Sequence, residues 1–118
     1  MDDIGVFEAI YSQRQFTRYK PDAVPREAID KIIDAATKAP SGGNKQPWHF
    51  IAITEPGLIE KIGGLYRDLW LGAMGATPPP GETPAYTAAR YLANHMPEVP
   101  AMILVCADHT MGSVPYNK

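Results

Sequence analysis

The stretch Ala39-Pro40-Ser41-Gly42-Gly43-Asn44-Lys45-Gln46-Pro47-Trp48-His49-Phe50 decides how the rest of the sequence is interpreted. Pro40 and the two glycines end any preceding helix and let the backbone turn tightly and approach a ligand closely. Ser41, Asn44 and Gln46 can donate and accept hydrogen bonds at the polar edge of a heterocycle. The pattern predicts a polar loop beside a strand. On local chemistry alone, Ser and Asn side chains that bond only to nearby backbone explain it equally well.

Helical and strand patterns alternate around this loop, which predicts an α+β fold with helices packed on a small sheet. Apolar residues at helical spacing predict helices over residues 3–13, 25–38, 57–71 and 85–95. Aromatic and β-branched runs predict strands over 48–54 and 101–107, and the second, unbroken apolar run predicts burial on both faces. Residues 72–84 contain four prolines and three glycines and predict a flexible loop.

Composition excludes several classes of protein. With 118 residues, 45% of them hydrophobic and 20% charged, the chain is predicted to form a single folded domain, 1–118. The net charge of −2 and the absence of a Lys/Arg cluster argue against nucleic acid as a partner. No apolar stretch is long enough to cross a membrane. The single cysteine, Cys106, and the scattered histidines predict a reducing, cytoplasmic location and no metal site.

Two motifs together resemble a known family. The run from Pro40 to Phe50 is similar to the signature loop of the FMN-dependent nitroreductases. Upstream, the segment from Arg14 to Tyr19 is followed by Lys20-Pro21-Asp22 and then by a predicted helix, in the order that the family shows. The likeness covers residues 7–71 well and residues 97–108 loosely, so the chain resembles the N-terminal portion of that fold.

The resemblance implies an activity. Members of the family are homodimers that bind FMN at the dimer interface and use NAD(P)H to reduce nitroaromatics, quinones or similar acceptors by a ping-pong reaction. No acid–base residue is assigned, because the cofactor carries the chemistry. Tyr66, Arg67 and Trp70, together with the loop 72–84, are candidates for shaping the acceptor pocket, although a surface helix beside a disordered loop explains them better.

The resemblance also implies which residues bind the cofactor. They are Arg14, Gln15, Thr17, Arg18, Pro40, Ser41, Gly42, Asn44 and Gln46. The basic run reaches FMN from one subunit and the Pro-Ser loop from the other, with Arg14 on the phosphate, since a guanidinium pairs with phosphate oxygens bidentately.

This sequence departs from the family pattern within the basic run. Where the family often has Arg-Arg-Ser-x-Arg, this chain has Gln13 and Gln15 in place of the first Arg and the Ser, and Thr17 in place of the last Arg. Either Arg18 supplies the missing positive charge near the flavin ring or another residue does. Without the family, Arg14 and Arg18 indicate a solvated surface pair.

The family's fold is longer than this chain, and that leaves three interpretations. The sequence is a fragment, it pairs with a second polypeptide, or it is a degenerate domain without flavin. Two functions other than a nitroreductase follow: a non-catalytic binding module, or a dehalogenase or flavin-destructase branch of the same superfamily.

Overall fold

The computed structural model describes residues 4–111. Its elements follow in the order α1 (Val6–Ser12), α2 (Arg26–Ala36), η1 (Gly42–Asn44), β1 (Trp48–Ile53), α3 (Pro56–Met74), α4 (Pro84–His95), η2 (Met96–Glu98), β2 (Met102–Ala107) and η3 (His109–Met111). This mixture of helices with a small sheet confirms the predicted α+β class. All four predicted helices and both predicted strands are present, with shifted ends. The first residue of the predicted helix 3–13 lies outside the described residues.

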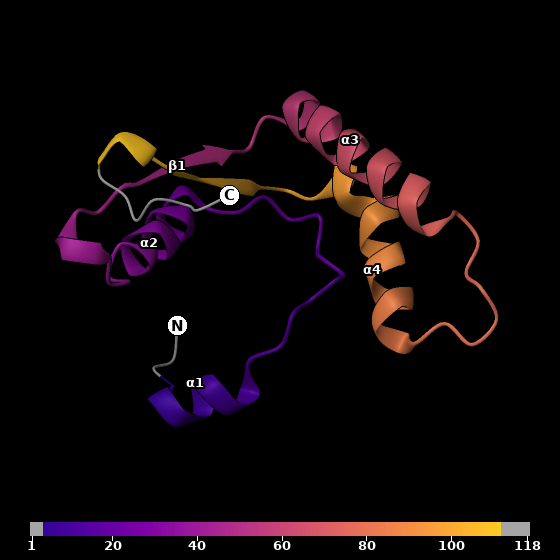
Figure 1. The fold of residues 1–118 in the computed structure, drawn as a ribbon, viewed down its shortest axis with the longest axis horizontal. Coiled ribbons are helices and arrows are strands. Elements are labelled where there is room, and N and C mark those ends of the chain that lie inside the picture. The colour runs from indigo at the N-terminus through magenta and orange to yellow at the C-terminus, as the bar shows by residue number, and fades with distance from the viewer. Residues whose placement is uncertain (1–3, 112–118) are drawn as a thin grey trace.

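The two strands pair with each other in antiparallel fashion (Figure 1). The register runs from Trp48 opposite Ala107 to Ile53 opposite Met102. Helix α2 lies against β1, where Ile29 and Phe50 line a shared hollow. This pairing holds together two segments that are about fifty residues apart in the sequence.

The prediction that the second strand is buried on both faces is wrong. Leu104 is 51% exposed and Val105 is 65% exposed. The strand is part of a two-stranded sheet within residues 4–111, and no helix in that part of the chain covers these two side chains. An unbroken apolar run is therefore present without the layers that normally bury it.

Helices α3 and α4 and the short η2 form a second packed unit, whose centre holds the buried side chains of Ile59 and Leu92. At Gly63, α3 approaches η2 so closely that an added Cβ would lie 2.5 Å from the backbone nitrogen of Pro97 and 2.7 Å from the carbonyl carbon of Met96. Glycine is required here because any larger residue would push the two elements apart.

The link between α3 and α4 is shorter than the predicted loop 72–84. Helix α3 continues to Met74, and Pro84 occupies the first turn of α4, which suits its fixed φ angle. The buried guanidinium of Arg90 forms an ion pair with the carboxylate of Glu82 and donates to the carbonyl oxygen of Gly75, both in this link. It also lies 5.1 Å from the ring centroid of Trp70. One side chain therefore ties both ends of the link to the helices.

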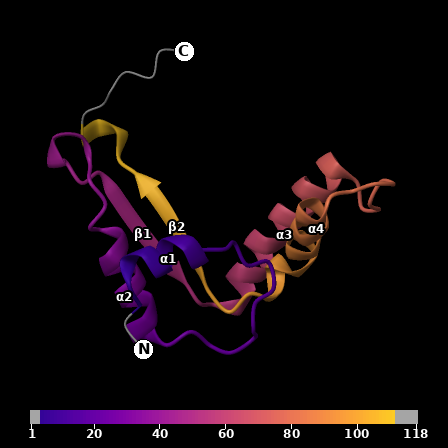
Figure 2. The ribbon, with the colours of Figure 1, turned by 90° about the horizontal axis from the view of Figure 1, so that it is seen from below.

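The chain is more open than a compact protein of its length. Its radius of gyration is 17.5 Å, against about 13.5 Å for a compact domain of this size. Figure 2 shows the sheet with α2 as one arm and the α3–α4 pair as the other. The predicted apolar stripes are only partly covered: Ile29 is buried, whereas Ile32 is 55% exposed and Leu65 is 67% exposed. Much apolar surface is therefore exposed in this chain.

Gly63→Ala should destabilise the protein by about 1–3 kcal/mol, the usual cost of overpacking, because the new methyl group meets rigid backbone in η2. Urea unfolding measures this change in the free energy of unfolding. Gly64→Ala is the matched control, since nothing lies within 4 Å of an added Cβ there. It should be neutral or stabilise the helix by up to ~1 kcal/mol. Equal losses in both variants would contradict the close approach at Gly63.

Glu82→Gln should change how stability depends on acid. The hydrogen bond from Arg90 holds the pKa of Glu82 below its ordinary value of 4.5, with a smaller contribution from Thr87 and with burial opposing. The unfolded chain therefore binds the proton more readily, so this stabilisation is complete above the ordinary pKa and disappears as the pH falls through the lowered one.

The natural protein should thus lose its stability advantage over Glu82→Gln as the pH falls from the ordinary pKa of 4.5 through the lowered pKa of Glu82. Thermal unfolding at a series of pH values measures the difference. Glu60→Gln, at an exposed position on α3, is the control and should follow the natural profile. A constant difference between natural protein and Glu82→Gln across this range would argue against the ion pair.

Candidate functional site

The loop between α2 and β1 has an unusual backbone. Three of its residues have positive φ angles: Gly43 at 59°, Asn44 at 53° and Gln46 at 51°. Glycine and asparagine adopt this region at low cost, whereas a glutamine there is uncommon. Such conformations persist only where the surroundings impose them, and they concentrate at binding sites.

Short-range hydrogen bonds impose this conformation. The Ser41 hydroxyl oxygen accepts from the Gln46 backbone nitrogen at 2.9 Å, and the Asn44 backbone nitrogen donates to the Ser41 carbonyl at 2.9 Å. The Gln46 side-chain amide donates to the Asn44 amide oxygen at 3.0 Å. The sequence analysis allowed Ser41 and Asn44 to bond only to nearby groups. Those bonds are present, and they fix the loop in one shape.

The loop joins the sheet firmly. The backbone nitrogen of Asp108 donates to the Pro47 carbonyl at 2.7 Å, next to the Trp48–Ala107 pair. The Asp108 carboxylate accepts from the hydroxyl and the backbone nitrogen of Thr110, and these bonds hold its pKa below the usual range. The nearby His49 and His109 lower it further. A charged carboxylate therefore stabilises the turn beside the loop, a contact that the sequence did not indicate.

The candidate binding groups of this loop face solvent. Gly42, Asn44 and Gln46 are exposed, and Ser41 is half-buried. Nothing lies within 4 Å of the place where a Cβ would stand on Gly42, so a ligand can approach the backbone directly. Pro40 is exposed at the end of α2. This arrangement offers amide donors and acceptors to a flat, polar-edged molecule.

The basic run lies on an extended arm after α1. The Nη1 atom of Arg14 donates to the carbonyl oxygens of Gln13 at 2.6 Å and Tyr11 at 3.2 Å. Both bonds use one nitrogen at the C-terminal end of α1, where a cation is favoured by the helix dipole. Gln15 is exposed beside it. The guanidinium is therefore held at one edge and exposed at the other.

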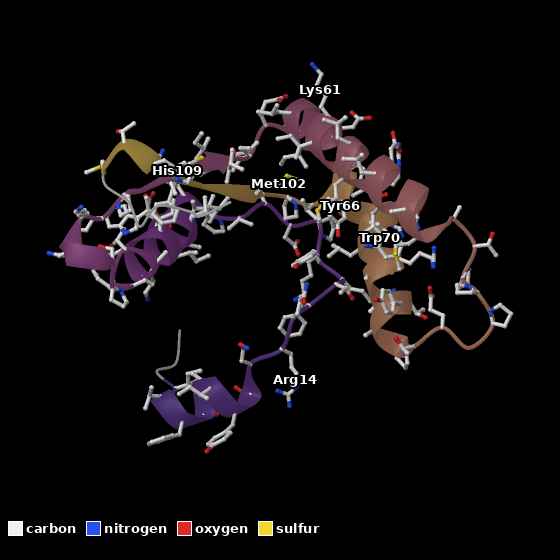
Figure 3. All side chains as sticks on the ribbon, in the orientation of Figure 1. Arg14, Lys61, Tyr66, Trp70, Met102 and His109 are labelled. Atoms are coloured by element: carbon white, nitrogen blue, oxygen red, sulfur yellow. The ribbon has the colours of Figure 1, made fainter. Side chains whose placement is uncertain are left out.

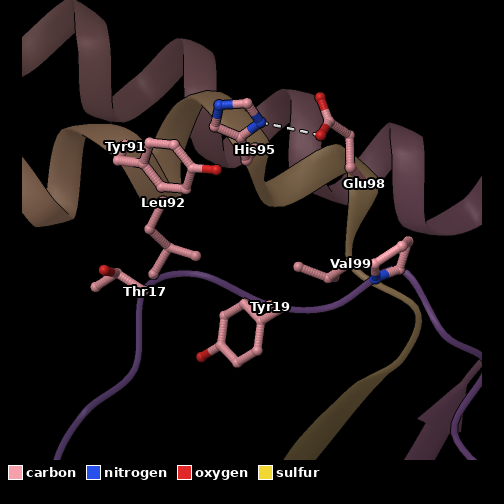
Figure 4. Close-up of a pocket in the computed structure, with 8 residues that line it drawn as sticks. Thr17, Tyr19, Tyr91, Leu92, His95, Glu98 and Val99 are labelled. Atoms are coloured by element: carbon pink, nitrogen blue, oxygen red, sulfur yellow. Dashed lines mark hydrogen bonds and ion pairs between the residues drawn. The ribbon is translucent and has the colours of Figure 1, made fainter.

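Further along the arm, Thr17 and Arg18 lie against α4. The guanidinium carbon of Arg18 is 3.7 Å from the ring centroid of Tyr91, a cation–π contact. Thr17 lines a cavity of about 200 Å³ together with Tyr91 and His95 (Figure 4). The His95 ring stacks on Tyr91 at 4.2 Å, and its Nδ1 lies 2.9 Å from a carboxylate oxygen of Glu98. Tyr91 and His95 are wall residues that the sequence did not single out.

One chain does not bring the two motifs together. Arg14 lies at the end of α1, away from the α2–β1 loop (Figure 3). Arg18 and Thr17 contact residues of α4, which packs with α3 on the side of the molecule away from α2. The nine predicted cofactor-binding residues thus form two separate groups, the arm and the loop.

The three candidate acceptor-pocket residues on α3 have side chains that contact different parts of the molecule. Tyr66 lines an apolar hollow of about 320 Å³ between α3 and the sheet, together with Met102. Arg67 pairs at 2.9 Å with the neighbouring Asp68 carboxylate on the surface. Trp70 lies beneath Arg90. Arg67 and Trp70 thus make contacts with neighbouring protein side chains, whereas Tyr66 lines a hollow.

Metal ligands and membrane-spanning helices are the two remaining kinds of feature that bear on function in residues 4–111. No group of three or more His, Cys, Asp or Glu residues there could hold a metal ion. In the same residues, no helix has both the length and the apolar character needed to cross a membrane.

Comparison with known proteins adds to this geometry. The sequence model of the Nitroreductase family matches residues 11–117. A protein of Methanothermobacter thermautotrophicus, provisionally named NADH dehydrogenase/NAD(P)H nitroreductase, is 32% identical over 112 residues, which are 95% of this chain and 46% of that protein. Iodotyrosine deiodinase 1 of Rattus norvegicus is 39% identical over 57 residues, 48% of this chain and 20% of that protein.

A solved structure shares the fold. The crystal structure of a BluB-like flavoprotein from Clostridium difficile 630 superposes with a TM-score of 0.58 and 27% identity, over 87% of this chain and 48% of that one. This chain spans about half the length of the curated relatives that it matches.

Proposed function

The chain belongs to the nitroreductase family, and on that premise we propose that it forms part of a flavin-dependent oxidoreductase. We expect it to bind FMN non-covalently and to move electrons from NAD(P)H to a nitroaromatic, a quinone or a similar small acceptor in a ping-pong reaction. Bound FMN supplies the electron-transfer chemistry, and the protein binds and orients it. A cytoplasmic location is part of this proposal, supported by the single cysteine.

The exposed amide-rich loop carries the proposal. Asn44 and Gln46 present amide groups on a backbone whose positive φ angles are fixed by internal hydrogen bonds. A heterocycle that carries both carbonyl and N–H groups on its edge matches such donors and acceptors. Gly42 leaves room for the ring to approach the backbone. The residues present therefore suit a flavin, and the loop's preformed shape lowers the entropy cost of binding it.

Arg14 suits the phosphate of the same cofactor. Its guanidinium is exposed, and its two hydrogen bonds within the described residues both use Nη1. A planar guanidinium can still meet phosphate oxygens along its other edge. Gln15 lies next to it with an amide donor. Arg18 lies over the Tyr91 ring and has no assigned role on the cofactor in this proposal.

The separation of the two groups supports a homodimer. The arm and the α2–β1 loop lie in different parts of one chain (Figures 1 and 3). A ligand held by both groups at once therefore needs the arm of one copy and the loop of another. This arrangement is the proposed assembly, with FMN shared between two copies.

Two other functions compete with this proposal. The similarity to iodotyrosine deiodinase 1 over 57 residues favours a dehalogenating branch as the second candidate. In that case the bound flavin would serve a halogenated substrate in place of a nitroaromatic. A non-catalytic module is the third candidate, motivated by Thr17 and Gln13 in the basic run. Turnover of NAD(P)H with nitroaromatic, quinone and halophenol acceptors distinguishes the three.

The purified protein should bind FMN and appear yellow. Titration of FMN into the protein should change flavin fluorescence, because binding moves the isoalloxazine ring from water into contact with protein groups. Riboflavin, which lacks the phosphate, is the control ligand and should bind more weakly. A colourless protein that leaves FMN fluorescence unchanged would refute flavin binding by this chain.

Arg14→Ala should weaken FMN binding by about 1.5–3 kcal/mol, the contribution typical of a hydrogen bond to a charged group. The same variant should leave riboflavin affinity unchanged. Arg26→Ala removes another exposed arginine, whose partner is Asp30 on α2, and serves as the matched control. If FMN affinity is the same in Arg14→Ala and Arg26→Ala, the phosphate assignment is incorrect.

A further inference from the structure

A small cavity lies where the arm meets the C-terminal half of α4, and its walls come from three segments of the chain. The arm supplies Thr17 and Tyr19, α4 supplies Tyr91, Leu92 and His95, and the residue after η2 supplies Val99 (Figure 4). A dry cavity of about 150 Å³ can hold benzene. This cavity of about 200 Å³ therefore admits a single six-membered ring with a small substituent.

The ring of Tyr91 is contacted on both of its faces. The guanidinium carbon of Arg18 lies 3.7 Å from the ring centroid, and the His95 ring stacks on it with the two centroids 4.2 Å apart. Two groups this close to one centroid cannot share a face, so the phenol ring lies between them. His95 is itself constrained, because its Nδ1 lies 2.9 Å from a carboxylate oxygen of Glu98. The orientation of the Tyr91 side chain is therefore set before a ligand binds.

The hydroxyl group of this ring faces the cavity. Figure 4 shows it directed between His95 and Leu92, toward the middle of the lining residues. It makes no hydrogen bond within residues 4–111, whereas the Tyr19 hydroxyl donates to the carbonyl oxygen of Phe16 at 2.9 Å. A phenol hydroxyl can donate one hydrogen bond. The cavity thus presents a donor whose orientation is fixed, and such preorganisation lowers the cost of binding an acceptor group.

The remaining walls indicate which kind of ligand fits. Leu92 is buried and lines the cavity together with Val99, so most of a ligand there would contact apolar side chains. Apolar walls with a single oriented donor suit a small planar ring that carries an oxygen acceptor, such as a nitro group or a quinone carbonyl. The Glu98 carboxylate at the rim disfavours a negatively charged ring. The ligand class is therefore an uncharged monocyclic nitroaromatic or quinone.

We propose that this cavity is the subsite for the electron acceptor, and that the Tyr91 hydroxyl orients the acceptor by donating a hydrogen bond to its nitro or carbonyl oxygen. As an acceptor site, the cavity rests on the proposed function. Thr17 belongs both to the cavity wall and to the group proposed to bind the cofactor, so the two ligands would lie next to each other. Arg18 is a positioning residue, because it acts through the Tyr91 ring.

Tyr91→Phe removes the hydroxyl group and keeps the ring. Nitrobenzene should bind the natural protein without flavin, and its Kd from NMR titration should rise about three- to tenfold in Tyr91→Phe, the usual effect of losing a neutral hydrogen bond. Isopropylbenzene is similar in shape but has no acceptor oxygen, so it should bind both proteins equally. Tyr86→Phe is the matched control, because Tyr86 is exposed on the same helix and does not line the cavity.

Two further variants test the cavity and the positioning residue. Val99→Phe places a larger side chain in the cavity and should abolish binding of both nitrobenzene and isopropylbenzene. Arg18→Gln removes the cation from the Tyr91 ring, so it should weaken nitrobenzene binding about two- to threefold and leave isopropylbenzene binding unchanged. Arg18→Lys retains a cation and should restore nitrobenzene affinity. In the Tyr91→Phe background, Arg18→Gln should have no further effect, because the hydroxyl that it positions is absent.

The outcomes separate this inference from the flavin proposal. Equal nitrobenzene affinities in Tyr91→Phe and Tyr86→Phe would overturn the inference, as would a natural protein that does not bind nitrobenzene. Displacement of nitrobenzene by FMN would also overturn it, because the cofactor itself would then occupy the cavity. Nitrobenzene binding with the expected loss in Tyr91→Phe, but without any FMN binding by the natural protein, would support the binding site and refute the flavin proposal alone.

Discussion

The antiparallel pairing of β1 with β2 is the constraint on which the rest of the structure depends. It joins residues 48–53 to residues 102–107. The segment that connects the two strands, which contains α3 and α4, therefore begins and ends at the same end of the pair. At the other end, the pairing brings Asp108 against Pro47, which anchors the α2–β1 loop. The sheet thus positions the candidate binding loop at one end and a helical unit at the other. Because it has only two strands in the described residues, it leaves both parts largely uncovered.

The helical unit shows how such an open chain keeps local order. Gly63 permits helix-to-backbone contact with η2, and Arg90 neutralises a buried carboxylate while it holds the α3–α4 link. A buried ion pair is costly to form and more costly to break, because either partner alone would be an uncompensated charge. These contacts are internal to the unit. The exposed side chains of the sheet, such as Leu104 and Val105, have no such contacts within residues 4–111.

Sequence patterns predicted the elements well and the candidate site in part. The α2–β1 loop was recognised from Pro40 to Gln46 because proline, glycine and amide residues have strong local preferences. Its positive φ at Gln46, and the role of Asp108, were not predictable, because each depends on a hydrogen bond across the loop or from the distant end of β2. Arg18 was expected near a ligand, and its contact with Tyr91 depends on a helix more than seventy residues away in the sequence. The burial of β2 was predicted wrongly. An apolar run shows that a strand can be buried on both faces, but it does not show that other layers cover it in this chain.

The sequence by itself determined the secondary structure, the family and the chemical character of the α2–β1 loop. These follow from periodicity, turn residues and short motifs, all of which act over a few neighbouring positions. Only the tertiary structure decided which apolar faces are covered, that Arg90 lies buried against Glu82, and that the arm and the loop lie apart within one chain. Those outcomes depend on contacts between segments far apart in the sequence, and local preferences carry no information about which distant segment will approach.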